Sequence, residues 1–119
     1  MDQVNGTITL KAAAAYAENL LGRNVSGVFT VVDGTTQATL INLRPSYAAD
    51  DLITCVPFTG VSTPTLTGSK AIAAHTLVYQ AAGGKITDSS ANSALLVGMT
   101  GHENISADGG RGLVIRAPR

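Results

Sequence analysis

The chain has 119 residues, of which 45% are hydrophobic, 4% aromatic and 13% charged, and eight basic and eight acidic side chains leave no net charge. This length is typical of one domain, so we expect residues 1–119 to form a single folded unit. The balanced charge gives no field that would attract nucleic acid or an anionic membrane, and so few aromatic side chains argue against a sugar-binding or single-stranded nucleic-acid-binding module.

Three features of the chain bear on the compartment in which it is made. Its single cysteine, Cys55, cannot form a disulfide within the chain, although small secreted domains usually depend on such bonds. The first residues, MDQVNGTITLK, have no basic flank before an apolar run and do not predict a signal peptide. The stretch KAAAAYAENLLG is too short and too polar to span a bilayer. We therefore expect synthesis in the cytosol and no membrane partner.

Residues 1–11 fit two interpretations. Val4, Ile8 and Leu10 are spaced as in one face of a strand, so the segment could be an extended arm that adds a strand to the edge of a partner's sheet. In the other interpretation, Thr7–Leu10 is the first strand of the domain's own sheet. Both interpretations stay open at this stage.

The following segment, Lys11–Leu21, is also open to two interpretations. Its run of alanines favours about three turns of helix, and Gly22 is a natural stop for such a helix. Its apolar residues form only a weak helical stripe, which fits an extended crossing between strands instead. The sequence therefore predicts at most one short helix.

The stretch GVFTVVDGTTQATL predicts a β-hairpin. Asp33 and Gly34 lie between β-branched residues, a combination that favours a two-residue type I′ turn. With Val32 opposite Thr35, one face of the hairpin would be rich in threonine. The other, core-forming face would carry Phe29, Val31, Thr36, Ala38 and Leu40.

Short apolar runs continue through the second half of the chain. LITCVPF predicts a strand, with Pro57 at its end or at a sheet edge, and TGVSTPTLTGSK predicts a link. TLVYQ, a turn at Ala81–Gly84 and KITD predict a hairpin, and ALLVGMT and GLVIR predict two more strands. The expected fold is mainly β: a small single-domain β-barrel or sandwich with an extended N-terminal arm.

Few side chains are candidates for chemistry. His75 and His102 are interpreted as surface or loop residues, because Asp88, Glu103 and Asp108 show no ligand spacing around them. A small hydrolase that uses His102 and Asp108 is the weakest of the functions considered. We therefore predict no catalytic, metal-binding or cofactor-binding residues and no cofactor.

Three further motifs have structural interpretations. Cys55 lies within an apolar run, where a thiol behaves as a small buried hydrophobe. Asp50 and Asp51 are adjacent and poorly placed to share a proton, so they predict a turn before the next strand. The glycines of Gly109–Gly112 could wrap a phosphate, but a strand rather than a helix follows them, which favours a tight turn.

The order of motifs in the C-terminal half carries a resemblance. Residues 49–116 contain, in sequence, a lysine followed by small residues, a "VY" strand, a Gly-Lys turn, a strand ending in glycine and a closing apolar strand. This order resembles that of the small capsid decoration, or cement, proteins of tailed phages. The matching segments are Gly68-Ser69-Lys70-Ala71, Leu77-Val78-Tyr79, Gly84-Lys85-Ile86-Thr87, Leu95-Leu96-Val97-Gly98 and Leu113-Val114-Ile115.

The resemblance implies a non-enzymatic protein of the virion exterior that binds an expanded icosahedral head and bridges major capsid subunits. It implies a homo-oligomer, either a trimer or a dimer, at symmetry-related sites. If residues 1–11 are an arm, the capsid contacts would include Val4, Ile8 and Leu10. The alternative function is a secreted or cell-surface β-sandwich module that serves as an adhesin or a carrier.

Overall fold

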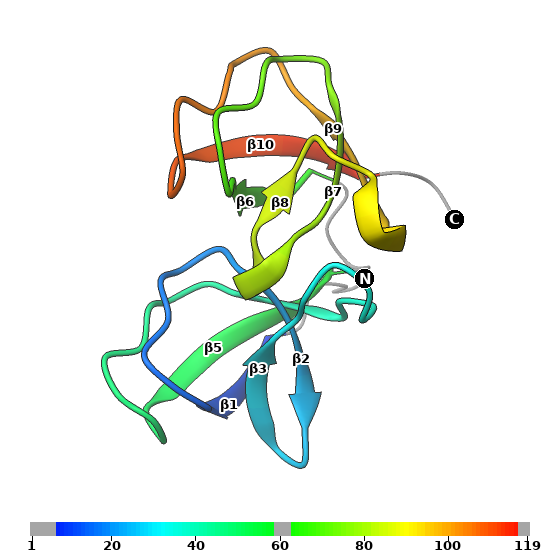
Figure 1. Ribbon diagram of the computed structural model, residues 1–119. Coiled ribbons are helices and arrows are strands. Elements are labelled where there is room, and N and C mark those ends of the chain that lie inside the picture. The colour runs from blue at the N-terminus through cyan, green and yellow to red at the C-terminus, as the bar shows by residue number, and fades with distance from the viewer. Residues whose placement is uncertain (1–6, 59–62, 117–119) are drawn as a thin grey trace, which may run out of the picture.

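Two β-sheets account for most of the chain in the computed structural model, which describes residues 7–58 and 63–116 (Figure 1). The first sheet closes into a five-stranded barrel, with strand order β1-β3-β2-β4-β5. The second has the order β6-β10-β9-β7-β8. The mainly β fold is therefore confirmed. The barrel strands are β1 (Ile8–Ala12), β2 (Leu21–Val25), β3 (Val28–Val31), β4 (Leu40–Asn42) and β5 (Leu52–Pro57).

The second sheet is built from five strands of the C-terminal half. Two three-residue 3₁₀ helices, η2 (Ala82–Gly84) and η3 (Ala91–Ser93), connect its strands. The strands are β6 (Thr65–Thr67), β7 (Leu77–Gln80), β8 (Ile86–Thr87), β9 (Leu96–Thr100) and β10 (Arg111–Arg116). The predicted hairpin through Ala81–Gly84 and the two following strands are confirmed. Strand β6 lies within the segment predicted as a link.

Strand β1 supports the second interpretation of Thr7–Leu10, because Ile8–Leu10 belong to the domain's own sheet. Residues 8–11 pair antiparallel with β5, and residues 11–12 pair parallel with β3. Leu10 is only 8% exposed, and its side chain packs in the barrel core. Of the other predicted capsid contacts, Ile8 is 41% exposed and Val4 lies outside the described residues. Contact of these residues with a capsid stays a prediction.

The helix considered for Lys11–Leu21 is absent, so that interpretation was wrong. The segment leaves β1 at Ala12, crosses irregularly and enters β2 at Leu21. Tertiary contacts outweigh the helix propensity of alanine here, because this path buries Ala12 and Leu20. It also lets the Ser46 hydroxyl donate to the Ala14 carbonyl oxygen at 2.7 Å.

The predicted hairpin at Asp33 and Gly34 was also wrong. Strand β3 pairs with β2 through a tight turn at Ser26 and Gly27, and a loop of residues 32–39 then carries the chain to β4. Both turn residues have positive φ, 54° and 85°, as a type I′ turn requires. Asp33 instead organises the loop. Its Oδ1 accepts hydrogen bonds from the Thr35 and Thr36 backbone N–H groups, which hold the pKa of Asp33 below its usual value.

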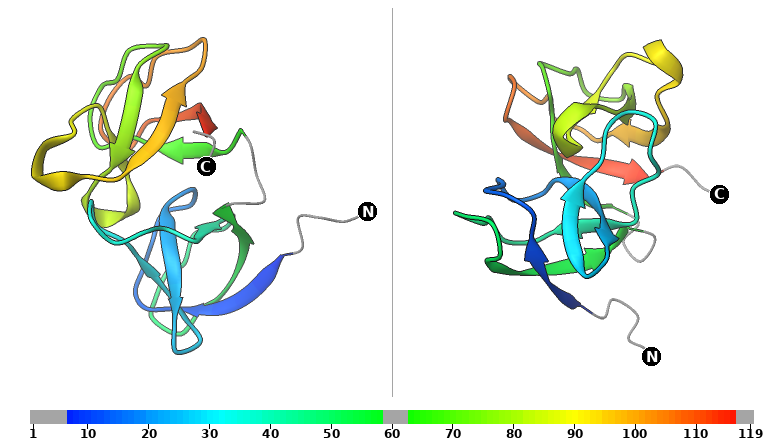
Figure 2. Two further views of the ribbon diagram at one scale, coloured as in Figure 1. Left: turned by 90° about the vertical axis from the view of Figure 1, so that its right-hand side faces the viewer. Right: turned by 60° about the horizontal axis from the view of Figure 1, so that its bottom comes forward.

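The two sheets share one apolar core, and the barrel has a second core of its own. The two halves are stacked on each other in all three views (Figures 1 and 2). The barrel core contains Leu10, Ala12, Phe29, Leu40, Ile53 and Cys55. The shared core joins Leu21, Val32, Ala38, Ile41, Val56 and Phe58 to Leu66, Ile72, Val78, Ile86, Val97, Ile105 and Val114.

Buried Gln80 links the two halves. From β7 it reaches the loop of residues 32–39: its Oε1 accepts from the Ala38 N–H at 3.0 Å, and its Nε2 donates to two loop carbonyl oxygens. Nearby, the backbone N–H of Gly84 donates to the Val32 carbonyl at 2.9 Å. The barrel loop is thus fixed to the second sheet by polar contacts as well as by the shared core.

Candidate functional site

The outer side of the second sheet carries a row of exposed apolar side chains. Leu77 of β7 lies opposite Met99 of β9, and Met99 lies opposite Ile115 of β10. These side chains are 48%, 37% and 52% exposed, respectively. Leu113, two residues before Ile115, points to the same side and is 49% exposed. We call Leu77, Leu96, Met99, Leu113 and Ile115 the apolar face.

Leu96 extends the apolar face beyond this row. It pairs with Tyr79, which lies two residues after Leu77, and a register shift between Val78 and Tyr79 accommodates the pairing. The opposite side of the sheet is in the shared core and carries Val78, Val97 and Val114. Strands β9 and β10 are therefore apolar on both sides, a pattern typical of strands that are covered on both faces.

The edges of the second sheet are less available than its outer face. Gly68, after β6, forms a bridge with Ile86 of β8, which brings the two ends of the sheet together. On the other side of β6, the Thr67 N–H donates to the Asn19 carbonyl at 3.2 Å. The face, rather than an unpaired strand edge, is thus the surface that this sheet offers to another protein.

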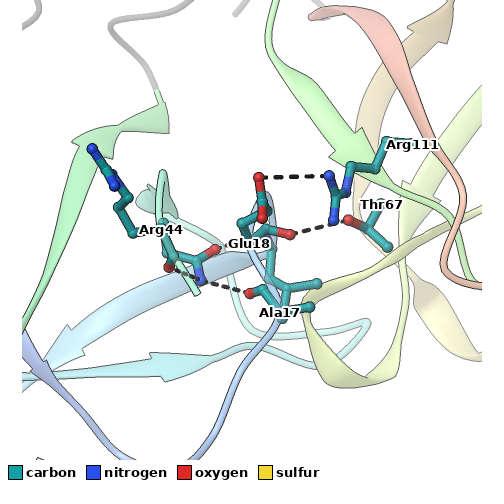
Figure 3. A network of polar contacts seen from close by, with 7 residues as sticks. Ala17, Glu18, Arg44, Thr67 and Arg111 are labelled. Carbon is teal, nitrogen blue, oxygen red and sulfur yellow. Dashed lines mark hydrogen bonds and ion pairs between the residues drawn. The ribbon is translucent and has the colours of Figure 1, made fainter. Parts of the chain in front are cut away.

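A polar network fixes the crossing segment 13–20 between the halves (Figure 3). Asn42, which is buried, donates from Nδ2 to the Ala17 carbonyl at 2.7 Å. Thr67 donates to the Glu18 carbonyl at 3.3 Å, and the Glu18 carboxylate lies 3.5 Å from the Arg111 guanidinium. Because Arg111 begins β10, the network ties the strand that carries Leu113 and Ile115 to the barrel.

Two histidines lie beyond one end of the apolar face. His75 precedes β7 and His102 follows β9, and their ring centroids are 5.4 Å apart with an angle of 78° between the ring planes. Both are exposed, as predicted for loop residues. A hollow of about 260 Å³ between His102, Glu103 and Leu113 joins this end to the apolar face.

The two residues considered for a hydrolase, His102 and Asp108, each contact another side chain. The carboxylate of Asp108 accepts a hydrogen bond from the Lys85 ammonium at 2.8 Å, whereas His102 contacts the ring of His75. Cys55 is buried in the barrel core, as predicted, and this burial raises the pKa of its thiol to about 11. A thiol with so high a pKa is a poor nucleophile at neutral pH.

The turns predicted at Asp50–Asp51 and at Gly109–Gly112 are confirmed. Asp51 accepts the backbone N–H groups of Tyr47 and Ala48 on its Oδ2, at 2.8 and 3.1 Å, directly before β5. Residues 108 and 109 form a turn before β10, in which Gly109 has φ of 85°. Each motif therefore has a structural role in leading the chain into a strand.

A hollow of about 360 Å³ lies between the Asp33 loop and the β7–η3 segment. Its two most polar groups are already engaged: Asp33 accepts two loop N–H groups, and the Gln80 side chain holds the same loop. These groups stabilise the loop. The hollow is lined by Asp33, Gly34, Thr35, Gln80, Ala81, Ala82, Thr87, Ser89, Ala91, Asn92 and Ala94.

Within residues 7–58 and 63–116, no three His, Cys, Asp or Glu side chains lie close enough together to hold a metal ion. In the same part of the chain, no helix has the length and apolarity needed to cross a bilayer.

No protein-family model matches the chain, and a search of curated proteins finds no match.

The apolar face was not identified from the sequence, although a signal for it is present. In ALLVGMT and GLVIR consecutive residues are apolar, so both faces of each strand carry apolar side chains. A strand with one solvent-exposed face instead alternates apolar and polar residues. The signal could not be assigned to a face, because strand order and register were unknown. The structure supplies both by aligning Leu77, Met99 and Ile115.

Proposed function

We propose that this chain is a structural virion protein that binds the exterior of an icosahedral phage head and cements neighbouring major capsid subunits. The proposal includes assembly as a trimer or dimer at symmetry-related sites. It has two supports: the order of motifs in residues 49–116 and the apolar face of the second sheet.

The observation that carries the proposal is the row formed by Leu77, Met99 and Ile115. Three large apolar side chains side by side on a sheet leave a contiguous surface that is unfavourable in water and suited to a protein interface. The chain's zero net charge fits the same use, because weakly charged surfaces favour association.

Binding of this kind needs no reactive side chain. A ligand that binds only the assembled, expanded shell stabilises that state by mass action. The stabilisation grows with the logarithm of the ratio of ligand concentration to the Kd of the ligand. An oligomer that contacts several subunits at once adds avidity to modest individual contacts. Apolar and main-chain contacts, repeated over many copies, would then be sufficient to stabilise the shell.

The test uses expanded heads that lack decoration protein, assembled from the major capsid protein encoded in the same genome. Purified chain is mixed with the heads and centrifuged, and the heads are then heated to measure the temperature at which they break open. The proposal expects saturable co-sedimentation and a higher breakage temperature. A chain that neither sediments with the heads nor changes their stability would contradict the proposal.

Mass spectrometry of purified virions distinguishes the alternative function. A cement protein is expected in the particle at a fixed ratio to the major capsid protein. A secreted adhesion or carrier module would instead be found in the medium or on the cell surface.

A further inference from the structure

We propose that His75 and His102 form a surface site that chelates a divalent transition metal of the zinc, nickel or copper type. This site lies beside one end of the apolar face, next to Leu113. The inference does not depend on the function proposed above. Neutral imidazole is the side chain that these borderline metals most often use in proteins.

The separation of the two rings suits one shared ion. With metal–nitrogen bonds of about 2.0–2.1 Å and tetrahedral geometry, two imidazoles on the same ion have centroids about 5 Å apart. The observed separation is 5.4 Å, with a 78° angle between the ring planes. Because both side chains are exposed, rotation about their side-chain bonds is free to direct one nitrogen of each ring to a common point.

The backbone beneath the rings is firmly held by hydrogen bonds between the two loops. Ile72 and Ile105 are buried and exchange two backbone hydrogen bonds, of 2.9 and 2.8 Å. The Ala74 N–H donates to Asn104 Oδ1 at 2.8 Å. These contacts lie on one side of the pair, before His75 and after His102, and they restrain the Cα positions of the histidines before a metal arrives. Such preorganisation lowers the entropic cost of chelation.

Buried Thr100 fixes the turn that carries His75. Its hydroxyl donates to the Ala73 carbonyl at 2.7 Å and accepts from the Thr76 N–H at 2.9 Å. The backbone of His75 has φ of 56°, in the left-handed region that few residues other than glycine adopt, although asparagine, aspartate and histidine adopt it more often than most. The surrounding hydrogen bonds thus hold His75 in a sparsely populated conformation that places its ring beside that of His102.

The site would leave further coordination positions open. Among the described residues, no third His, Cys, Asp or Glu lies close enough to join the pair in binding a metal ion. Water or a donor atom from another molecule would therefore complete the coordination shell. A two-ligand site of this kind is expected to bind more weakly than a closed structural zinc site.

The test measures binding of ZnCl₂ and NiCl₂ to the full, untagged chain by isothermal titration calorimetry, with MgCl₂ as the hard-cation control. The variants are His75→Asn and His102→Gln, alone and together, and Glu103→Gln as the matched control. Asparagine is used at position 75 because it tolerates positive φ. Circular dichroism verifies that each variant is folded.

The proposal expects one saturable site per chain for zinc and nickel and none for magnesium. Each single histidine variant should weaken binding by roughly tenfold or more, since the second imidazole acts at a high effective concentration. The double variant should be little worse than either single one, and Glu103→Gln should bind as the unchanged chain does. Undiminished binding in either folded histidine variant, or independent binding to each histidine, would overturn the proposal. So would the absence of binding to the unchanged chain.

Discussion

Gly83 and Gly84 lie side by side in η2 with nearly the same φ, 74° and 75°, but in different surroundings. A Cβ atom on Gly83 would meet nothing within 4 Å. On Gly84 it would lie 2.5 Å from the Leu21 carbonyl oxygen. Gly84 is therefore required for close contact between η2 and β2, whereas Gly83 is required only for the turn's backbone conformation.

Alanine substitutions should separate these two requirements. Gly83→Ala is expected to lower the free energy of unfolding by about 1 kcal/mol, the cost of positive φ for a residue with a Cβ. Gly84→Ala adds a clash with backbone atoms, so we expect a loss of about 3 kcal/mol or more. Urea denaturation of both variants measures the difference. Equal losses would show that η2 does not pack on β2 as described.

Cys55 gives a prediction for pH and reactivity. Burial raises the pKa of its thiol from the ordinary value of 9.0 to about 11, so the unfolded chain loses the proton first as the pH rises. The contribution of this group to stability is therefore complete below about pH 9 and is lost between pH 9 and pH 11. The free energy of unfolding falls as the pH rises from 9 to 11, because the thiol ionises more readily in the unfolded chain.

The measurement is the rate at which an aromatic disulfide reagent modifies the thiol at pH 8. The folded chain is expected to react far more slowly than the same chain in denaturant, where Cys55 is exposed. Comparison of Cys55→Ala with the unchanged chain over pH 8 to 11 isolates the pH effect. Rapid modification of the folded chain would place Cys55 outside the core.

At the scale of elements, the turn between β2 and β3 shows why one hairpin was missed and another wrongly predicted. Asp33 and Gly34 match the favoured sequence of a type I′ turn, whereas Ser26 and Gly27 match it less well. In the structure, Ser26 adopts φ of 54° despite its lower preference for this region, because β2 and β3 are held in place by their barrel neighbours. Local turn preference was outweighed by the pairing of whole strands.

The substitution Ser26→Asn tests this account of the turn. Asparagine tolerates positive φ better than serine, so the variant is expected to be more stable by about 0.5 kcal/mol. Ser26→Val is the matched opposite, because a β-branched residue disfavours this conformation, and it should cost about 1 kcal/mol or more. Thermal unfolding compares the two. The reverse order of stability would show that position 26 does not have positive φ.

Strands were predicted well where the local sequence determines the conformation. They were predicted poorly where contacts with the rest of the molecule determine it. LITCVPF, TLVYQ, ALLVGMT and GLVIR are apolar runs bounded by turn residues, and each contains a strand. The alanine-rich segment 11–21 and the threonine-rich β6 have ambiguous local preferences, so their conformations depend on the barrel and β10, which they contact. Such dependence is not visible in one sequence.

At the scale of the whole molecule, the two halves are joined by a shared core and by polar links of different strength. Gln80 is buried and bonded to the loop of residues 32–39, whereas Glu18 and Arg111 form an ion pair that is partly exposed to solvent. Buried hydrogen-bonding groups are costly to leave without partners, and exposed ion pairs contribute little. The halves should therefore depend far more on Gln80 than on the ion pair.

Leucine substitutions at both positions test this ranking. Gln80→Leu leaves the Ala38 N–H and two loop carbonyl groups without partners and should cost about 3 kcal/mol. Arg111→Leu removes only the partly exposed ion pair and should cost less than about 1 kcal/mol. Chemical denaturation gives both values. A larger loss for Arg111→Leu would contradict the ranking.

The candidate site depends on this whole-molecule arrangement, which explains how little of it could be predicted. Each strand's apolar residues are visible in the sequence, but the row of Leu77, Met99 and Ile115 exists only after β7, β9 and β10 have paired in register. The two histidines are likewise 27 positions apart and meet through the pairing of their loops. Of the residues predicted to contact the capsid, Leu10 is instead used by the barrel core.

The central claim, that the apolar face binds the capsid, is tested most directly by co-sedimentation of two charge variants with expanded heads. Met99→Glu places a charge in the middle of the face. Leu52→Glu makes the same change at an apolar side chain of the barrel that is 71% exposed. Both variants should fold, because neither side chain is in the core. We expect Met99→Glu to lose most binding and Leu52→Glu to bind as the unchanged chain does. Full binding by Met99→Glu would contradict the claim.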